Sequence, residues 1–574
     1  MKAMILRAAG LSALLLALAL TARAANPYLP LWEYIPDGEP YVFEDPDHPG
    51  QYRVYIYGSH DTMQSEYCGR DQVVWSAAVE DLRHWRFDGV IFTSRTNAKG
   101  ELLRPNGLGD VLYAPDVVEK IGADGRKTYY LYPNNQAGGR QGMVARSDRP
   151  DGPFEVCNWD AKNPARTDGV LRFDPGVFID DDGRVYGFWG FKESFAAELD
   201  PATMATLRPG TEVVRPLPAS EGFQFFEASS PRKIGDKYIL VYSRVTPDGE
   251  FGLPSSNYNL AYAYSDAPLG PYVYGGTIID ARARGVDWGG NPVATASPNG
   301  NTHGGLARIG DQWYIFYHRQ AGTTGYARQA MVAPVQISVS PGPGGKVEIT
   351  EAEYTSEGFE LGGLDPLEWH SAGIACYYTG PQLSVKDRGG NIFYGSYIAP
   401  MYGVWQPGIG VYEQTLDRYA SVEDAYDLSV NSNPVVNNTP GSVVGYKYFN
   451  FDGIRAARAY RLLVKMVPQG VRGRIVVMAD SPWKDRGGRR LGVIRLSGRE
   501  PQELTTVHAR VRPVRRLQGK HAIYFVFEGS SAVMPDPIGH PDPQGTPGPA
   551  GGDAPGVMPN PSLCELHAFT FARR

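Results

Sequence analysis

Three short phrases place acidic side chains at the starts of predicted strands. The first, PDGEPYVF, holds Asp37 and Glu39; the second, FDPGVFI, holds Asp174; the third, FQFFEASS, holds Glu227. Acid–base catalysis needs one group that donates a proton and one that accepts it, and carboxyl groups do both when their surroundings differ. The three phrases therefore predict acid–base chemistry, although Pro, Asp and Gly around Asp37 are also the composition of an ordinary turn.

The surroundings of these acids differ. Glu39 and Asp174 each precede a proline, which extends the backbone, so that each carboxylate is presented from the start of a strand. Glu227 has three phenylalanines and small residues around it, and a desolvated carboxyl group has a raised pKa, as a general acid at neutral pH requires. The DDDG run at Asp180 lacks the other ligand positions of an EF-hand, and we interpret it as a turn.

The acids need a scaffold that brings distant strands together, and the chain contains an internal repeat that predicts one. Five segments of aromatic and β-branched residues resemble one another, and four of them follow closely on a Gly-Asp or Asp-Gly turn. They begin at Tyr52, Lys127, Gly183, Asp236 and Asp311.

A second phrase recurs between these segments. ARSDRPDGPFE from Ala145 matches AYSDAPLGPYV from Ala263, and WSAAVEDLRHW from Trp75 is a looser relative. Five strand-rich units without helical periodicity predict an all-β fold, a five-bladed β-propeller over residues 25–340. The alternative is a two-sheet sandwich with coincidental similarities.

Further strands follow the predicted propeller. Residues 341–433 form a connecting region that either links two domains or belongs to the second one. Short alternating strands from residue 434 to 574 predict a β-sandwich of the jelly-roll type. A Pro- and Gly-rich stretch from Pro535 is typical of a low-complexity loop between the last strands.

The first 24 residues and the overall charge bound the compartment and the partners. Lys2 and Arg7 precede an apolar run that closes on Ala22-Arg23-Ala24, which predicts a secretory signal peptide over residues 1–24 and export to the periplasm or beyond. The net charge of −6, spread without blocks, argues against nucleic-acid and anionic-membrane partners. Four cysteines allow three pairings, so no disulfide is predicted.

The phrases DGEPYVF, LYAPDVVEK, FDPGVFIDDDGRVYGFWG, FEASSPRKIGDKYILVYS and NTHGGLARIGDQWYIFYHR, in this order, resemble glycoside hydrolase family 43. The resemblance implies an inverting mechanism with three acids. It places Glu227 on the general acid and Asp174 on the acid that orients it and tunes its pKa. It places Glu39 on the base, where most members have Asp, and Asp37 remains the alternative base.

The same resemblance implies roles for three other residues. Asp116 in YAPDVV either contacts the sugar or holds a turn near the site. Arg319, which ends FYHR, matches an arginine that binds substrate hydroxyls, and His318 is then expected to point the other way along the strand. His303 matches a histidine near the propeller axis that orders water or a metal ion, often calcium. No metal ligand is assigned and no cofactor is required, while a structural calcium ion held through water is compatible with His303.

The C-terminal sandwich more faintly resembles carbohydrate-binding modules of the family 6 type. Its segment VVGYKYFNF offers Tyr446, Tyr448 and Phe449 for stacking on sugar rings, although the same side chains could equally form the core.

These features predict a carbohydrate substrate and an exported, inverting exo-glycosidase that removes terminal arabinofuranosyl or xylosyl units. Two alternatives remain: an exo-β-1,3-galactosidase of the same family, and a propeller that binds glycans without cleaving them. The related fructan-cleaving propellers are disfavoured because their Asn-Asp-Pro-Asn-Gly phrase is absent.

Overall fold

The computed structural model describes residues 25–573 except 63–66, 104–108, 288, 297–299, 323–324, 381–382, 387–391, 401–432, 453, 455–459, 512–516 and 530–561. The predicted signal peptide, residues 1–24, and the Pro- and Gly-rich stretch from Pro535 lie outside these residues. Within the described part of the chain, no helix is long and apolar enough to span a membrane.

Five antiparallel sheets follow one another along the first part of the chain. Blade 1 contains β1 (Glu39–Glu44), β2 (Tyr52–Tyr57), β3 (Asp71–Ala78) and β4 (Arg86–Thr93). Blade 2 contains β5 (Asp116–Ile121), β6 (Lys127–Tyr132), β7 (Ala145–Ser147) and β8 (Glu155–Val156). Blade 3 contains β11 (Gly176–Ile179), β12 (Val185–Trp189) and β13 (Phe195–Leu199). Blade 4 contains β14 (Phe225–Ile234), β15 (Lys237–Thr246), β16 (Ser256–Ser265) and β17 (Val273–Asp280). Blade 5 contains β20 (Leu306–Ile309), β21 (Gln312–Gln320) and β22 (Arg328–Val335).

Short elements connect and extend the blades. The small two-stranded sheets are β9 (Trp159–Asp160) with β10 (Asn163–Thr167), β18 (Arg284–Val286) with β19 (Pro292–Ala294), and β23 (Ile337–Val339) with β24 (Val347–Ile349). Single 3₁₀ turns are η1 (Gly138–Arg140), η2 (Ala219–Glu221) and η3 (Glu250–Gly252).

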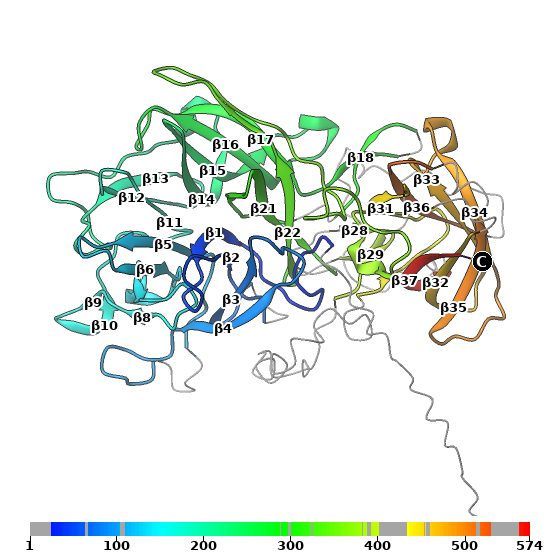
Figure 1. The fold of residues 1–574 in the computed structure, drawn as a ribbon, viewed down its shortest axis with the longest axis horizontal. Coiled ribbons are helices and arrows are strands. Elements are labelled where there is room, and N and C mark those ends of the chain that lie inside the picture. Colours follow the sequence, from blue (N-terminus) through cyan, green and yellow to red (C-terminus); the bar gives the residue numbers. More distant parts are fainter. Residues whose placement is uncertain are drawn as a thin grey trace, which may run out of the picture.

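The blades close into a ring around their first strands. β5 packs beside β11, β11 beside β14, and β1 beside β20, so the first and last blades meet (Figure 1). The N-terminal segment is tied to blade 5, because Asn26 Nδ2 donates to Val332 O at 2.8 Å and Asn26 Oδ1 accepts from Val332 N at 3.0 Å. The first residues of the inner strands therefore converge on one centre.

The predicted five-bladed propeller is confirmed, and the repeats have a structural meaning. The five similar segments are the second strands of the blades, β2, β6, β12, β15 and β21. The repeated phrases at Ala145 and Ala263 both lead from the third to the fourth strand of a blade, and the looser phrase at Trp75 does the same in blade 1.

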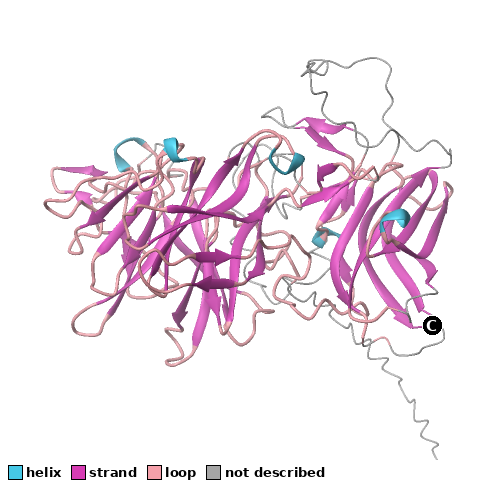
Figure 2. Cartoon of the chain, turned by 90° about the horizontal axis from the view of Figure 1, so that it is seen from above, coloured by secondary structure: helices cyan, strands magenta, loops and turns pink. Residues whose placement is uncertain are grey.

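A sandwich of two sheets follows the propeller, beside it in Figure 2. One sheet contains β26 (Tyr377–Thr379), β31 (Val443–Asn450), β36 (Lys520–Gly529), β33 (Arg472–Ala479) and β34 (Arg489–Ser497). The other contains β29 (Tyr397–Ile398), β30 (Val435–Val436), β37 (Cys564–Arg573), β32 (Tyr460–Pro468) and β35 (Thr505–Val511), with β25 (His370–Ser371) paired to β37. The remaining elements are β27 (Leu383–Lys386), β28 (Ile392–Tyr394), η4 (Ala372–Ile374) and η6 (Lys484–Arg486).

The connecting region and the three aromatic residues proposed for sugar stacking are placed by this sandwich. β25 and β26 lie in the connecting region and pair with β37 and β31, so residues 370–379 belong to the sandwich sheets.

Tyr446 and Phe449 are fully buried in the core and cannot stack on a sugar. Tyr448 is half-buried, and its hydroxyl donates to Glu353 Oε1 at 2.8 Å. A glycan-binding role of the sandwich stays a prediction.

The two domains share one hydrophobic core. A single cluster of buried side chains extends from Ile239 and Ile315 in the propeller to Phe525 and Phe569 in the sandwich. Burial of this much apolar surface ties the domains together far more strongly than a polar contact between separate modules does.

Candidate active site

A cavity of about 600 Å³ opens where the inner strands of the propeller converge. Three of the predicted acids line it, namely Asp37, Asp174 and Glu227. They come from blades 1, 3 and 4, since Asp37 precedes β1, Asp174 precedes β11, and Glu227 lies near the start of β14. The described lining does not include Glu39, Asp116, His303 or Arg319.

Asp37 and Asp174 occupy equivalent positions in their blades. The first strand pair of blade 1 is Glu39 with Tyr57 and that of blade 3 is Gly176 with Phe188, so each aspartate stands two residues before its strand is paired. Both have left-handed backbone conformations, with φ of 60° at Asp37 and 45° at Asp174. Non-glycine residues adopt this conformation rarely and at a cost, and they cluster at functional sites.

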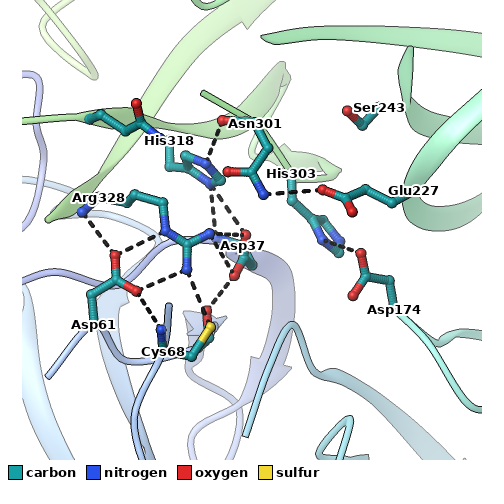
Figure 3. A network of polar contacts seen from close by, with 12 residues as sticks. Asp37, Asp61, Cys68, Asp174, Glu227, Ser243, Asn301, His303, His318 and Arg328 are labelled. Atoms are coloured by element: carbon teal, nitrogen blue, oxygen red, sulfur yellow. Dashed lines mark hydrogen bonds and ion pairs between the residues drawn. The ribbon is translucent and has the colours of Figure 1, made fainter. Parts of the chain in front are cut away.

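The carboxylate of Asp37 is surrounded by donors. Arg328 Nη1 donates to Asp37 Oδ1 at 3.1 Å (Figure 3). The hydroxyl of Ser59 donates to Asp37 Oδ2. Arg328 is itself fixed by Asp61, with Nε to Oδ2 at 2.9 Å and Nη2 to Oδ1 at 2.8 Å. Burial alone would raise the pKa of Asp37, but the charge of Arg328, together with the neighbouring histidines and the hydrogen bond from Ser59, holds the pKa below its ordinary value. Asp37 is therefore ionised at neutral pH.

His318 lies against the same aspartate. Burial lowers the pKa of His318 to about 3, so the ring is neutral. Its Nδ1 accepts from the backbone N–H of Asp37 at 3.1 Å, and its Nε2 therefore carries the proton and donates to Asn301 O at 2.8 Å. The neutral ring positions the backbone of Asp37 without adding charge beside its carboxylate.

Glu227 and Asp174 have no arginine on their oxygens, and each accepts a hydrogen bond from a neutral amide. Asn301 Nδ2 donates to Glu227 Oε1 at 3.1 Å, and Asn134 Nδ2 donates to Asp174 Oδ1 at 2.8 Å. Burial, together with the neighbouring charge of Asp174, raises the pKa of Glu227 to about 8. Burial raises the pKa of Asp174, and the charge of His303 partly opposes this effect. The pKa of Asp174 is therefore about 6. At neutral pH Glu227 therefore holds a proton and Asp174 is ionised.

Glu39 lies on the propeller axis, outside the cavity. Arg232 Nη2 donates to Glu39 Oε2 at 2.7 Å and the hydroxyl of Ser230 donates to the same atom at 3.0 Å. A Cβ added at Gly305 would stand 2.5 Å from Glu39 Oε2, so the carboxylate is enclosed by close packing. Asp116 is its neighbour in this buried group and accepts from the hydroxyl of Tyr41 at 2.7 Å.

His303 connects the axis to the cavity. Its Nε2 lies 3.6 Å from Glu39 Oε1 and its Nδ1 lies 3.8 Å from Asp174 Oδ2. Burial alone would lower the pKa of His303, but the carboxylates of Glu39, Asp174 and Asp37 outweigh burial and raise the pKa to about 9. The ring is a buried cation between acids.

The protonated ring of His303 does not fit as a direct ligand of a metal ion. A protonated imidazole has no lone pair for a metal ion, and calcium prefers six to eight oxygen ligands. In the described part of the chain, no three His, Cys, Asp or Glu side chains gather in an arrangement that could hold a metal. A calcium ion held through water stays a prediction.

Two predicted roles change with this geometry. The resemblance placed Glu39 on the base, but the strand pairing aligns Asp37 with Asp174 and aligns Glu39 with Asp116, the first paired residue of β5. Arg319 was expected to bind substrate, but it is fully buried and its guanidinium donates to Gln329 Oε1 at 3.0 Å and to Ala375 O at 2.6 Å. It clamps the propeller to the sandwich.

His318 and Arg319 point to opposite sides of β21, as predicted, but each faces the side expected for the other. His318 faces the cavity side and Arg319 faces the sandwich. The arginine of the cavity is Arg328, which sequence reasoning missed. Sequence reasoning also missed Ser59, Asp61 and Asn134, which bond to the cavity acids or to Arg328. Their position was a usable signal, because each follows one of the repeated second strands, β2 or β6.

An ionised carboxylate and a protonated carboxyl group thus line one cavity, supported by a second carboxylate beside the proton donor. Glycoside hydrolases use such a pair of groups: a carboxylic acid protonates the leaving oxygen, while a carboxylate activates water or attacks the sugar.

Comparisons with known proteins agree with this class. The family model for glycosyl hydrolases family 43 matches residues 42–340. A xylosidase/arabinosidase from Thermoclostridium stercorarium is 32% identical over 537 residues, which cover 88% of this chain and 96% of that relative. An arabinoxylan arabinofuranohydrolase from Paenibacillus polymyxa is 26% identical over 318 residues, covering 52% of this chain and 45% of that relative.

A solved structure of a family 43 arabinoxylan arabinofuranohydrolase from Bacillus subtilis, in complex with cellotetraose, is 20% identical and covers 95% of this chain and 96% of its own. Its TM-score is 0.42, and this likeness adds nothing to the assignment. The family match and the 32% identity over nearly the whole chain decide it: the chain belongs to glycosyl hydrolase family 43.

Proposed function

We propose that the protein is an exported, inverting exo-glycosidase that removes terminal arabinofuranosyl or xylosyl units from plant polysaccharides or their oligosaccharides. Glu227 is the general acid, Asp37 is the general base, and Asp174 is the carboxylate that keeps the acid protonated and oriented. The proposal depends on one observation: Asp37 and Glu227 line the same cavity with pKa values shifted in opposite directions.

Each group has a defined part in the reaction. Glu227, with its pKa raised to about 8, carries the proton that goes to the glycosidic oxygen as the bond to the sugar breaks. Asp37 accepts a proton from the water that attacks the opposite face of the sugar, so the product has the inverted anomeric configuration. Arg328 keeps Asp37 ionised before the reaction. The sugar specificity is supported by the names of the relatives, a xylosidase/arabinosidase and an arabinoxylan arabinofuranohydrolase.

The test is turnover of nitrophenyl α-L-arabinofuranoside, β-xyloside and β-galactoside, with the anomer formed first identified by proton NMR. We expect cleavage of one of the first two substrates and an inverted first product. A retained anomer rejects inversion, and cleavage of the galactoside alone selects the exo-β-1,3-galactosidase. Absence of turnover on all three, on arabinoxylan and on galactan selects the non-catalytic glycan-binding propeller.

Export is tested separately. The full chain is expressed with its own first 24 residues in a bacterial host, and the mature N-terminus is determined by sequencing. We expect the exported protein to begin near Ala25. Retention of the uncleaved chain in the cytoplasm contradicts export and leaves the catalytic proposal unaffected.

A further inference from the structure

Three phenylalanine side chains gather on one side of the cavity. Phe173, Phe191 and Phe226, here called the phenylalanine wall, all line it. The ring centroids of Phe173 and Phe191 are 5.0 Å apart, and those of Phe191 and Phe226 are 5.1 Å apart. Phe191 keeps 44% of its surface exposed. A contiguous, exposed apolar surface beside a polar cavity indicates a binding surface.

The wall is held by the backbone and does not depend on a ligand for its shape. Phe191 lies in the loop after β12, and the two residues beside it bond to the other two wall residues. Gly190 N donates to Phe173 O at 2.9 Å, and Lys192 N donates to Phe226 O at 2.6 Å. Gly190 has φ of 140°, and a Cβ there would stand 1.9 Å from Glu193 O, so the position requires glycine. A preformed surface binds without a large ordering cost.

The position of the wall along the chain assigns it to one end of the substrate. Phe226 directly precedes Glu227, and Phe173 directly precedes Asp174. In the inverting reaction the acid stands beside the departing oxygen, while the base and its water stand on the opposite face of the sugar. The wall therefore borders the space of the leaving group. The base side of the cavity instead presents the charged Arg328, with the thiol Sγ of Cys68 at 3.3 Å from its Nη2 and the ring of Tyr67 over its guanidinium at 4.9 Å.

The chemistry of the wall selects a class of leaving group. Phenylalanine rings have no hydrogen-bonding group, so they recognise a flat apolar ring face and not a pattern of hydroxyls. A xylopyranosyl residue has no hydroxymethyl or carboxylate substituent on the ring, and both of its faces can lie flat on an aromatic surface.

We propose that the phenylalanine wall is the leaving-group subsite, which binds the apolar face of a xylopyranosyl residue, and that Phe191 determines the preference for it. This inference rests on the proposed role of Glu227 as the general acid. It covers removal of xylosyl units from xylan and of arabinofuranosyl units from arabinoxylan, because the leaving group in both of these reactions is a xylopyranosyl residue.

The test compares two substrates that differ only in the leaving group. One is an oligosaccharide with a xylopyranosyl leaving group, xylobiose for xylosyl transfer or arabinofuranosyl-xylobiose for arabinofuranosyl transfer. The other is the glycosyl fluoride of the same sugar, whose leaving group has no ring. We expect Phe191→Ala to lower kcat/KM on the oligosaccharide about 10-fold, mainly through KM, as the loss of one aromatic contact predicts. Hydrolysis of the fluoride stays within about 2-fold of wild type, since it makes no use of the wall.

Two further variants distinguish the loss of sugar stacking from a general loss of folding or activity. Phe191→Trp keeps an aromatic face and is expected to restore the wild-type KM. Tyr52→Ala removes another exposed aromatic side chain, 47% exposed and paired with Glu44 at the end of β1 far from Asp37, and is expected to leave kcat/KM on both substrates unchanged. Equal losses on both substrates, or no loss on the oligosaccharide, overturn the inference.

Failure of the proposed function remains distinguishable. If wild type cleaves neither substrate, that function is rejected. Calorimetric titration of xylotriose into wild type and Phe191→Ala then still tests whether the phenylalanine wall binds a sugar. Weaker binding by the variant supports a sugar-stacking surface, whereas equal binding rejects it.

Discussion

Asp37 and Glu227 lie on the same cavity and are both buried, but the groups around them differ. Asp37 has an arginine on its carboxylate, and Asp61 fixes that arginine from the other side. Glu227 receives a neutral amide from Asn301 and has a second carboxylate nearby. Burial is common to both sides, so the charges placed beside each acid decide which one keeps its proton.

This difference sets the expected pH dependence of kcat/KM. The reaction needs Asp37 ionised, and its lowered pKa makes that condition hold well below neutral pH. It also needs Glu227 protonated, which holds below its pKa of about 8 and fails as the pH rises through that value. A bell-shaped profile with an alkaline limb near pH 8 follows. Each variant below moves one limb of that profile or removes one of its groups.

The largest effect is expected for Asp37→Asn. Loss of the general base should lower kcat by about 10³-fold or more. The fold should survive, because Arg328 keeps its two bonds to Asp61. Activity on the preferred nitrophenyl glycoside and thermal unfolding measure both expectations.

Glu39→Gln is the matched comparison, two residues further along the chain. It leaves the charge of Arg232 partly unpaired in a buried site, so thermal stability should fall. Its kcat should fall by no more than about 10-fold, because the side chain acts only through His303. If Glu39→Gln loses as much activity as Asp37→Asn, the base assignment is reversed.

Arg328→Lys should produce the next largest effect. One ammonium group cannot replace a guanidinium that spans Asp61 and Asp37, so the positive charge that stabilises ionised Asp37 is weaker and the pKa of Asp37 rises. A base with a raised pKa loses its charge at higher pH, so the acid limb should move upward, with a loss of about 10²-fold at pH 5.

Arg319→Lys is the control for a buried arginine on the neighbouring strand. Its side chain donates to Ala375 O and Gly373 O in the sandwich and contacts no cavity acid. Thermal stability should fall while the pH profile keeps its shape. A shift of the acid limb in this variant would contradict the assignment of Arg319 to the domain interface.

Asp174→Asn tests the acid side. Removing the neighbouring negative charge should lower the pKa of Glu227, since Asp174 is the second largest cause that raises it. The alkaline limb should then move to lower pH by about one unit, and kcat at pH 6 should fall about 10-fold to 100-fold through loss of positioning. An unchanged alkaline limb would show that Asp174 does not act through Glu227.

Much of this arrangement could be predicted from local patterns. The repeated second strands and the two loop phrases led to five blades, because alternation and turn composition are local properties. Strand entrances marked Asp37, Asp174 and Glu227 as candidates for the same reason. The choice between Asp37 and Glu39 depends on one turn, because the left-handed backbone of Asp37 carries no sequence signal that separates it from an extended residue.

Contacts between distant parts of the chain could not be predicted. Asp61 and Arg328 are 267 residues apart, and their pairing depends on the closure of the ring. Arg319 needed the position of the sandwich, because only Gly373 and Ala375 show which way it points. In both cases a charged side chain took its role from a partner that no local pattern could name.

The smallest effect, with the opposite sign to Asp174→Asn, is expected for Asn301→Ala. The amide of Asn301 stabilises ionised Glu227, so its removal should raise the pKa of Glu227 and move the alkaline limb upward. A single neutral hydrogen bond contributes about 1 kcal/mol, so the shift should be below about one pH unit. Gln136→Ala removes another amide from the cavity lining and should leave the limb in place, because Gln136 contacts Asn134 and not Glu227. A downward shift in Asn301→Ala would mean that the amide supports the protonated acid, and the acid side would then be tuned by hydrogen bonding as well as by charge.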